Sequence, residues 1–385
     1  MKKRYIFLTV LIVVIFVGGF ITGALLTNHN QTDQDIKIAK KSPPSSKGLE
    51  QKEMPKLSDD QSKALIGYVQ DFRDPNQIDY SNLTHIIFSF VHPTKDGQVL
   101  FTGEHATQNL KKMVAKAHEQ NTKVMLAVGG WFHLNGGETY DYFSAALSNQ
   151  ASQERLVKEL VAIVERENVD GIDIDFEHPR TDDDARNLHV FIEKLSEELH
   201  SRNKEVSIAV HSKIHGQTLT ELAYVKYETA MFHNVDYVNI MAYDGQWDGG
   251  YQAKNLSPYP FTESIVRYWA NLFDSHKLPK EKLVLGVPFY AQPEDPNSKQ
   301  LSYQTIINNN EQNAGKDVVT INGMTYHYNG QMTMLRKTEL ALQHGFGGMM
   351  VWELGHDATG AHSLTHTLSE TISATTIKNY YTLKK

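Results

Sequence analysis

The chain has 385 residues, of which 40% are hydrophobic and 22% are charged. This composition is typical of a globular protein and excludes a chain that is disordered throughout. Cysteine is absent, which excludes disulfide bonds, cysteine catalysis and thiolate metal sites. Beyond position 60, 39 acidic side chains outnumber 29 basic ones, and so acidic a domain is a poor partner for nucleic acid. We therefore expect no nucleic-acid partner.

In chain order, the first predicted element is a membrane anchor over residues 1–27. Lys2, Lys3 and Arg4 precede an uncharged apolar stretch, residues 5–26. As a helix this stretch would be roughly 33 Å long, which matches the hydrocarbon core of a bilayer. The alternative is a cleaved export signal. In both cases the positive cluster remains inside, so we expect the rest of the chain at the cell surface, anchored in the membrane, or alternatively secreted.

A flexible linker is predicted over residues 28–61, which are rich in Lys, Gln, Asp, Ser and Pro and show no apolar period. The folded domain is expected over residues 62–375, followed by a C-terminal tail over residues 376–385. The folded domain shows no internal repeat. The sequence therefore predicts one folded domain on a flexible tether.

Beyond residue 61, eight short apolar or β-branched runs alternate with longer segments of helical period. This alternation predicts an α/β fold of the (β/α)8 TIM barrel type, whose active site lies at the C-terminal ends of the strands. The predicted strands are residues 64–69, 85–91, 123–128, 171–176, 205–210, 237–242, 283–289 and 348–352. The predicted helices are residues 109–120, 152–167, 183–202, 262–276 and 332–344.

One interval is too long for a simple connection, because 58 residues separate Phe289 from Gly348. Only about the last 15 of them show a helical pattern. The first part, residues 292–329, is polar. We predict a long loop or a small strand-containing insertion there, rather than a second domain.

Residues 170–177 place acidic and bulky apolar side chains at alternate positions. On a strand, Asp173, Asp175 and Glu177 share one face, because residues two apart point the same way. Unpaired carboxylates are costly to bury, so three on one strand face indicate a functional site rather than a stabilising one. Asp170 lies three positions from Asp173 and is off that face, so we expect it to form hydrogen bonds at the start of the strand.

The same eight residues fit the pattern D-x-x-D-x-D-x-E and resemble the fourth strand of glycoside hydrolase family 18, the chitinase-like family. Further segments resemble the third, sixth and eighth strands of that family in the same chain order: residues 127–131, 241–244 and 347–354. The resemblance covers about residues 62–375 and implies the same barrel that the alternation predicts.

Two positions depart from the family pattern. Ala127 replaces the usual serine, and His178 follows the glutamate where an aromatic residue is common. Neither departure removes a catalytic group. We expect the first to weaken hydrogen bonding around the acid cluster and the second to alter contacts beside the cleaved bond.

The resemblance implies cleavage with retention, assisted by the 2-acetamido group of the substrate. It implies that Glu177 protonates the leaving oxygen, that Asp175 orients the acetamide group, and that Asp173 shares hydrogen bonding with Asp175. Tyr243 would donate its hydroxyl to the acetamide oxygen. The implied substrate-binding residues, for several of which core packing is the alternative, are Asp244, Trp352, Met241, Trp131, Tyr68, Phe90 and Tyr290. No metal ion or cofactor is expected.

From the spacing along the strand we expect a raised pKa for Glu177, because Asp175 and Asp173 lie roughly 7 and 13 Å behind it. The predicted function is a retaining, endo-acting hydrolase of β-1,4-linked N-acetylglucosamine glycans, with chitin or chito-oligosaccharides as substrate. N-glycan cores and peptidoglycan are the alternative substrates. The alternative class is a non-catalytic glycan-binding protein on the same fold. We expect a monomer.

Overall fold

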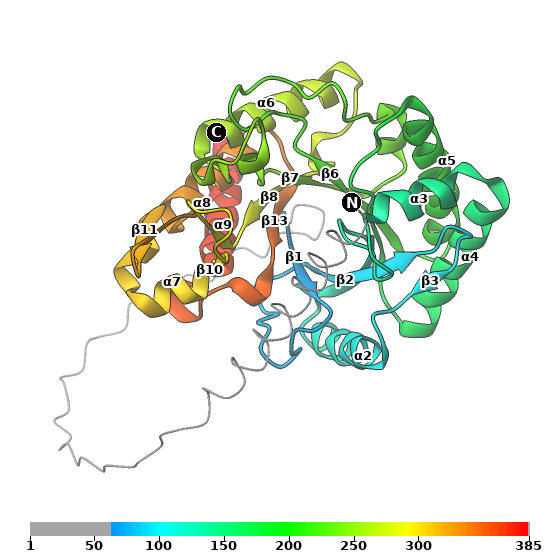
Figure 1. Cartoon of the computed structure of the whole chain (residues 1–385), viewed down its shortest axis with the longest axis horizontal. Helices are drawn as coiled ribbons and strands as arrows, with labels where there is room; N and C mark the ends of the chain where they lie inside the picture. Colours follow the sequence, from blue (N-terminus) through cyan, green and yellow to red (C-terminus); the bar gives the residue numbers. More distant parts are fainter. Residues whose placement is uncertain (1–62, 384–385) are drawn as a thin grey trace, which may run out of the picture. The chain divides into compact units, whose positions relative to one another are not determined.

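The computed structural model describes residues 63–383 (Figure 1). The predicted anchor over residues 1–27, with its apolar stretch 5–26, and the predicted linker over residues 28–61 lie outside this range. Within residues 63–383, no helix is both long enough and apolar enough to cross a bilayer. The described residues correspond to the predicted folded domain and most of the predicted C-terminal tail.

Eight parallel strands form a closed barrel, which confirms the predicted (β/α)8 architecture. The sheet closes because the first strand pairs in parallel with both the second and the last. Every predicted strand is present, with boundaries that differ by at most two residues. The barrel strands are β1 (Ala64–Gln70), β2 (His85–Pro93), β4 (Lys123–Gly129), β5 (Gly171–Asp175), β6 (Glu205–His211), β7 (Tyr237–Met241), β8 (Leu283–Pro288) and β13 (Gly348–Trp352).

Two separate apolar layers explain why the strands are apolar on both faces. The larger layer lies between the barrel and its helices and includes Ile172 and Ile174 of β5. The smaller layer fills the barrel interior and includes Ile66, Met125 and Met350. Successive side chains of a strand alternate between the two layers, so the acidic residues of β5 point into the barrel.

Helices cover the outside of the barrel (Figure 1). The five predicted helices correspond to α2 (Glu104–Glu119), α4 (Gln150–Glu167), α5 (Asp182–His200), α6 (Tyr259–Ser275) and α8 (Gln331–Gln343). Two barrel connections lack an α-helix: residues 71–84 between β1 and β2, and residues 212–236 between β6 and β7, where the regular helical element is the short 3-10 turn η2 (Thr229–His233).

Three helices were not predicted: α3, α9 and the short α7 (Tyr303–Asn309). Helix α3 (Thr139–Ser148) ends immediately before α4, with Asn149 between them as the N-cap of α4. Helix α9 (Leu364–Leu383) crosses the boundary expected at residue 375. Its sequence is rich in threonine, a residue of low helix propensity, which is why the periodic pattern did not reveal it.

The polar interval after β8 is the small strand-containing insertion, the second of the two predicted possibilities. It forms a four-stranded antiparallel sheet in the order β10-β9-β12-β11. Helix α7 (Tyr303–Asn309) lies within it, near β10 and β11 in Figure 1. The strands are β9 (Tyr290–Pro293), β10 (Leu301–Ser302), β11 (Val318–Ile321) and β12 (Met324–His327), and a separate short strand β3 (Val99–Leu100) pairs antiparallel with β2.

Candidate active site

The three acids of the motif lie at successive heights in the barrel. Asp173 and Asp175 of β5 are buried, with 0% and 3% of their surfaces exposed. Glu177 follows the C-terminal end of β5 and is half-buried. Phe176 packs in the outer layer against Tyr140 and Phe143, so the alternation directs Glu177 towards the inner side. The proposed proton donor is therefore at the mouth of the barrel and in reach of solvent.

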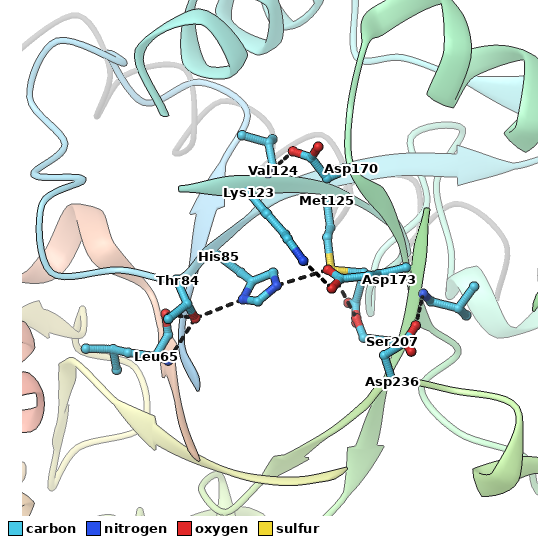
Figure 2. A network of polar contacts seen from close by, with 12 residues as sticks. Leu65, Thr84, His85, Lys123, Val124, Met125, Asp170, Asp173, Ser207 and Asp236 are labelled. Atoms are coloured by element: carbon cyan, nitrogen blue, oxygen red, sulfur yellow. Dashed lines mark hydrogen bonds and ion pairs between the residues drawn. The ribbon is translucent and has the colours of Figure 1, made fainter. Parts of the chain in front are cut away.

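Asp173 is held by three donors from three other strands. The Tyr68 hydroxyl donates to Asp173 Oδ2 at 2.7 Å. The Ser207 hydroxyl and the Asn239 amide donate to Asp173 Oδ1 at 2.5 Å and 3.2 Å. Figure 2 shows Ser207 beside Asp173, with the sulfur of Met125 close by. These bonds lower the pKa of Asp173, but burial has the larger effect and raises it to about 6.

Asp175 is the acid with a free oxygen. Its Oδ1 is buried and has no hydrogen-bond partner in the described part of the chain. Burial first, and then the neighbouring charges of Glu177 and Asp173, hold its pKa well above the usual range. An oxygen without a donor in so enclosed a position is available to accept a hydrogen bond from a bound ligand.

The pKa of Glu177 is raised to about 7, and the predicted direction is confirmed. Burial has the largest effect and the charge of Asp244 adds to it, while the expected repulsion between Glu177 and Asp175 raises the pKa of Asp175. The segment after Glu177 is fixed by a capping box, in which Thr181 and Asp184 bond to each other's backbone at the start of α5. The loop that carries Glu177 is thus short and anchored at both ends.

The turn after β7 brings Tyr243 and Asp244 to the same mouth. Tyr243 is buried in the interior layer, where its hydroxyl is 3.9 Å from the sulfur of Met350, a weak acceptor. Asp244 adopts a left-handed backbone with φ of 64° and is exposed. The hydroxyl of Tyr290 and the amide of Gln246 donate to Asp244 Oδ1.

Six of the predicted site residues share the interior layer. Two of them pack against a third, Trp352, whose ring centroid is 5.6 Å from that of Tyr68 and 5.8 Å from that of Phe90, the latter in a stacked arrangement. Trp131 is not part of this layer; it follows β4 and is 41% exposed. The six residues of the interior layer are Tyr68, Phe90, Met241, Tyr243, Tyr290 and Trp352.

The structure shows which groups surround the two residues that depart from the family pattern. Ala127 is fully buried and pairs in register with Asp173, so no hydroxyl reaches the acids from that position of β4. His178 is buried, with its ring centroid 5.1 Å from that of His211. Burial lowers the pKa of His178 to about 4, which leaves the ring uncharged at neutral pH.

Sequence reasoning missed three polar residues that support the site. Ser207 and Asn239 hold Asp173, and each lies between two apolar residues of its strand, a signal that marks a buried polar contact. Glu353 follows Trp352, is fully buried and forms an ion pair with Arg73 of the loop after β1. Asp170, by contrast, behaves as predicted: it accepts from the Val124 backbone N–H at 2.8 Å.

No group of three or more potential ligand side chains within residues 63–383 is arranged to hold a metal ion. The barrel mouth presents carboxylates, tyrosine hydroxyls and aromatic surfaces. A carboxyl group with a raised pKa at a barrel mouth is a candidate for proton transfer.

A model of glycosyl hydrolases family 18 matches residues 64–357. The chain belongs to this family. In sequence it is similar to chitinase 1 of Aphanocladium album, with 28% identity over 263 residues, covering 58% of this chain and 58% of that protein. Among solved structures, chitinase ChiB of Flavobacterium johnsoniae is 25% identical, with a TM-score of 0.67, covering 81% of this chain and 94% of that one.

A second solved structure, a class V chitinase of Nicotiana tobaccum in complex with NAG4, has a TM-score of 0.67 over 81% of this chain and 99% of that one. At 16% identity it supports the fold alone. The family membership places this chain among the glycoside hydrolases of the chitinase type.

Proposed function

We propose that this family 18 chain is a retaining, endo-acting hydrolase of β-1,4-linked N-acetylglucosamine glycans, with Glu177 as general acid and base. One observation carries the proposal. Half-buried Glu177, with a pKa of about 7, lies at the barrel mouth above Asp175, whose free Oδ1 is enclosed. A protonated donor and an unoccupied acceptor are the two groups that assisted glycoside cleavage requires.

In the proposed reaction Glu177 transfers its proton to the glycosidic oxygen while the acetamido oxygen of the same sugar attacks the anomeric carbon. The bond to the leaving group breaks and a cyclic oxazolinium ion forms. Asp175 accepts a hydrogen bond from the acetamide N–H and offsets the positive charge. Water then adds to the anomeric carbon, gives its proton to Glu177, and opens the ring with retention.

Tyr243 and Trp352 complete the proposed sugar site. The Tyr243 hydroxyl, whose contact in the described structure is the weak one to Met350, would donate to the acetamide oxygen and orient it for attack. Trp352, stacked on Phe90, would lie under the sugar ring, where an apolar surface suits the C–H face of a pyranose. Asp244 would bind hydroxyl groups of the cleaved sugar.

Chitin or chito-oligosaccharide is the proposed substrate, supported by the similarity to the chitinases of Aphanocladium album and Flavobacterium johnsoniae. N-glycan cores and peptidoglycan contain the same acetamido sugar and remain the alternative substrates. A non-catalytic glycan-binding role is the alternative class, and the presence of Glu177 counts against it. We further propose that the barrel acts outside the cell, anchored or secreted through residues 5–26, which cell fractionation tests. We also propose that it is a monomer, which light scattering tests.

The test of the proposed function is a product analysis with three substrates: an N-acetylglucosamine tetramer, peptidoglycan and a high-mannose glycopeptide. We expect the tetramer to be cut internally, giving dimers whose new reducing end is first formed as the β-anomer. Binding of the tetramer without cleavage would favour the glycan-binding alternative. If only peptidoglycan or only the glycopeptide were cleaved, that glycan would become the assigned substrate and the proposed reaction would stand.

The pH dependence of kcat/KM tests the state of the proposed acid. Because Glu177 must carry its proton to act, and its pKa is raised to about 7, we expect kcat/KM to be high below that pH. Above it, kcat/KM should fall about tenfold for each pH unit as the proton is lost. A profile whose alkaline limb lies near pH 4.5, the value of an ordinary glutamate, would contradict the assignment.

A further inference from the structure

Lys337 of α8 is a fully buried lysine that the proposed reaction does not use. Its ammonium donates to the backbone carbonyl of Ser257 at 2.6 Å, to the Ser257 hydroxyl oxygen at 2.7 Å, and to Asn329 Oδ1 at 2.7 Å. An ammonium has three protons, so each is used, and each goes to a neutral oxygen. Burial lowers the pKa of Lys337 to about 7, against the attraction of Asp317.

Burying a cation in a protein interior costs free energy. Removing a charge from water is penalised even when hydrogen bonds replace the solvent. Methionine has nearly the volume of lysine and would avoid that penalty, while the oxygen atoms of Ser257 and Asn329 would lose a donor. The charge at this position therefore points to a role other than stability.

The ammonium imposes a direction on its neighbours, because it can donate and cannot accept. The Ser257 oxygen must accept from Lys337, so the Ser257 proton goes elsewhere, and it is donated to the backbone carbonyl of Ala242 at 2.6 Å. Asn329 is oriented as well: its amide donates to the carbonyls of Ser257 and Tyr328, which turns Oδ1 towards Lys337. Each group in this network has one consistent orientation.

Ala242 begins the turn that carries two of the proposed sugar-binding residues. Its own N–H bonds to the carbonyl of Ile240 at 2.9 Å, which makes the turn tight. Tyr243 then points into the barrel interior, and Asp244 adopts its left-handed backbone at the mouth. The Ser257 hydroxyl, which lies outside this turn, thus fixes the orientation of the first peptide group of the turn, that of Ala242.

We propose that Lys337 is a positioning residue: through the Ser257 hydroxyl it holds the Ala242 peptide, and with it Tyr243 and Asp244, in the orientation that the reaction needs. The inference rests on the proposed function, in which Tyr243 orients the acetamido group. Lys337 itself lies behind the turn and contacts neither residue directly through the bonds described above. Its effect on turnover is mediated entirely by Ser257.

Three variants test the proposal: Lys337→Met, Ser257→Ala, and the two combined. A displacement of about 1 Å at a reacting group can cost about 100-fold in rate, so we expect each single variant to lower kcat about 10- to 100-fold on the N-acetylglucosamine tetramer. KM should change less. Because Lys337 acts through the Ser257 hydroxyl, the double variant should be no slower than Ser257→Ala alone.

The Lys337→Met variant is expected to fold. A pocket of about 240 Å³, lined by Ser257 and Asn329 among others, adjoins the network, so water can reach the acceptors that the ammonium leaves. Lys282→Met is the matched control. Lys282 is a half-buried lysine that donates to the carbonyls of Phe232 and His233, just before β8 at the opposite end of the barrel. Its loss should lower the melting temperature and leave kcat unchanged.

Additive losses in the double variant, an unchanged kcat in Lys337→Met, or equal losses of kcat in the Lys337 and Lys282 variants would each overturn the proposal. A crystal structure of Lys337→Met supplies a readout that does not depend on activity. We expect Tyr243 and Asp244 to be displaced in it, and an unmoved turn would also overturn the proposal. If the unaltered protein cleaves no glycan, the proposed function fails, whereas this structural comparison still decides the role of Lys337.

Discussion

Replacing Glu177 by glutamine should lower kcat by roughly 10² to 10⁴ while the fold is retained, the usual contribution of a positioned general acid. Glutamine has nearly the shape of glutamate but carries no proton that can be transferred at neutral pH. No hydrogen bond to the Glu177 side chain is found among residues 63–383, so the substitution removes no hydrogen bond within the described chain. Turnover of the N-acetylglucosamine tetramer, followed chromatographically, measures the effect, and thermal unfolding checks the fold.

Asp170→Asn is the matched control because Asp170 belongs to the same motif and lies at the other end of β5. Its carboxylate bonds to the Val124 backbone N–H and is 2.7 Å from Nε2 of His118. We expect this variant to unfold at a lower temperature with kcat close to that of the unaltered protein. If Glu177→Gln kept near-normal turnover, or if Asp170→Asn lost as much, the proton donor would have to be another residue.

The fold could be predicted from the sequence because each barrel strand is buried on both faces and reads as a short apolar run. The alternation in residues 170–177 also predicted correctly which side chains point inward, since that depends only on the two-residue period of a strand. Helix α9 was missed because its threonines give a weak local signal. The sequence pattern thus identified the strands and helices in which apolar side chains recur at a regular period.

The surroundings of the acids depend on pairings that no local pattern contains. Ser207 supports Asp173 because β6 pairs with β5 in a register that sets these two residues side by side. Asn239 joins them from β7, one strand further. The influence of Asp244 on the pKa of Glu177 arises from a left-handed turn after β7, which sequence spacing along β5 could not reveal.

The contacts between the aromatic residues likewise depend on strand pairing, which no local pattern contains. Tyr68, Phe90 and Trp352 come from β1, β2 and β13, and they meet because closure of the barrel places β1 between the other two. Trp131 follows a predicted strand in the same way, yet the chain leaves the barrel there and the side chain is largely outside the interior layer. Position after a strand therefore does not decide whether an aromatic side chain packs in the interior layer, and the predicted role of Trp131 in substrate binding stays a prediction.

Substrate in which the acetamido group of the reacting sugar is replaced by a free amine should not be hydrolysed. In the proposed route the acetamido oxygen is the nucleophile, and an amine offers no oxygen to attack the anomeric carbon. Intramolecular nucleophiles commonly correspond to effective molarities of 10⁵ M or more, so we expect the loss to be at least about 10⁴-fold. Rates for chito-oligosaccharides of defined acetylation pattern, with products located by mass spectrometry, measure it.

An oligosaccharide that keeps the acetamido group on the reacting sugar and carries the amine elsewhere is the control, and it should still be cut. This comparison separates chemistry from binding, because an ammonium near Asp175 would strengthen attraction to the site while removing the nucleophile. If both oligosaccharides were cut at equal rates, a protein carboxylate would have to attack instead. Asp175 would then be the residue to examine, since it is the buried acid next to Glu177 whose oxygen has no donor within residues 63–383.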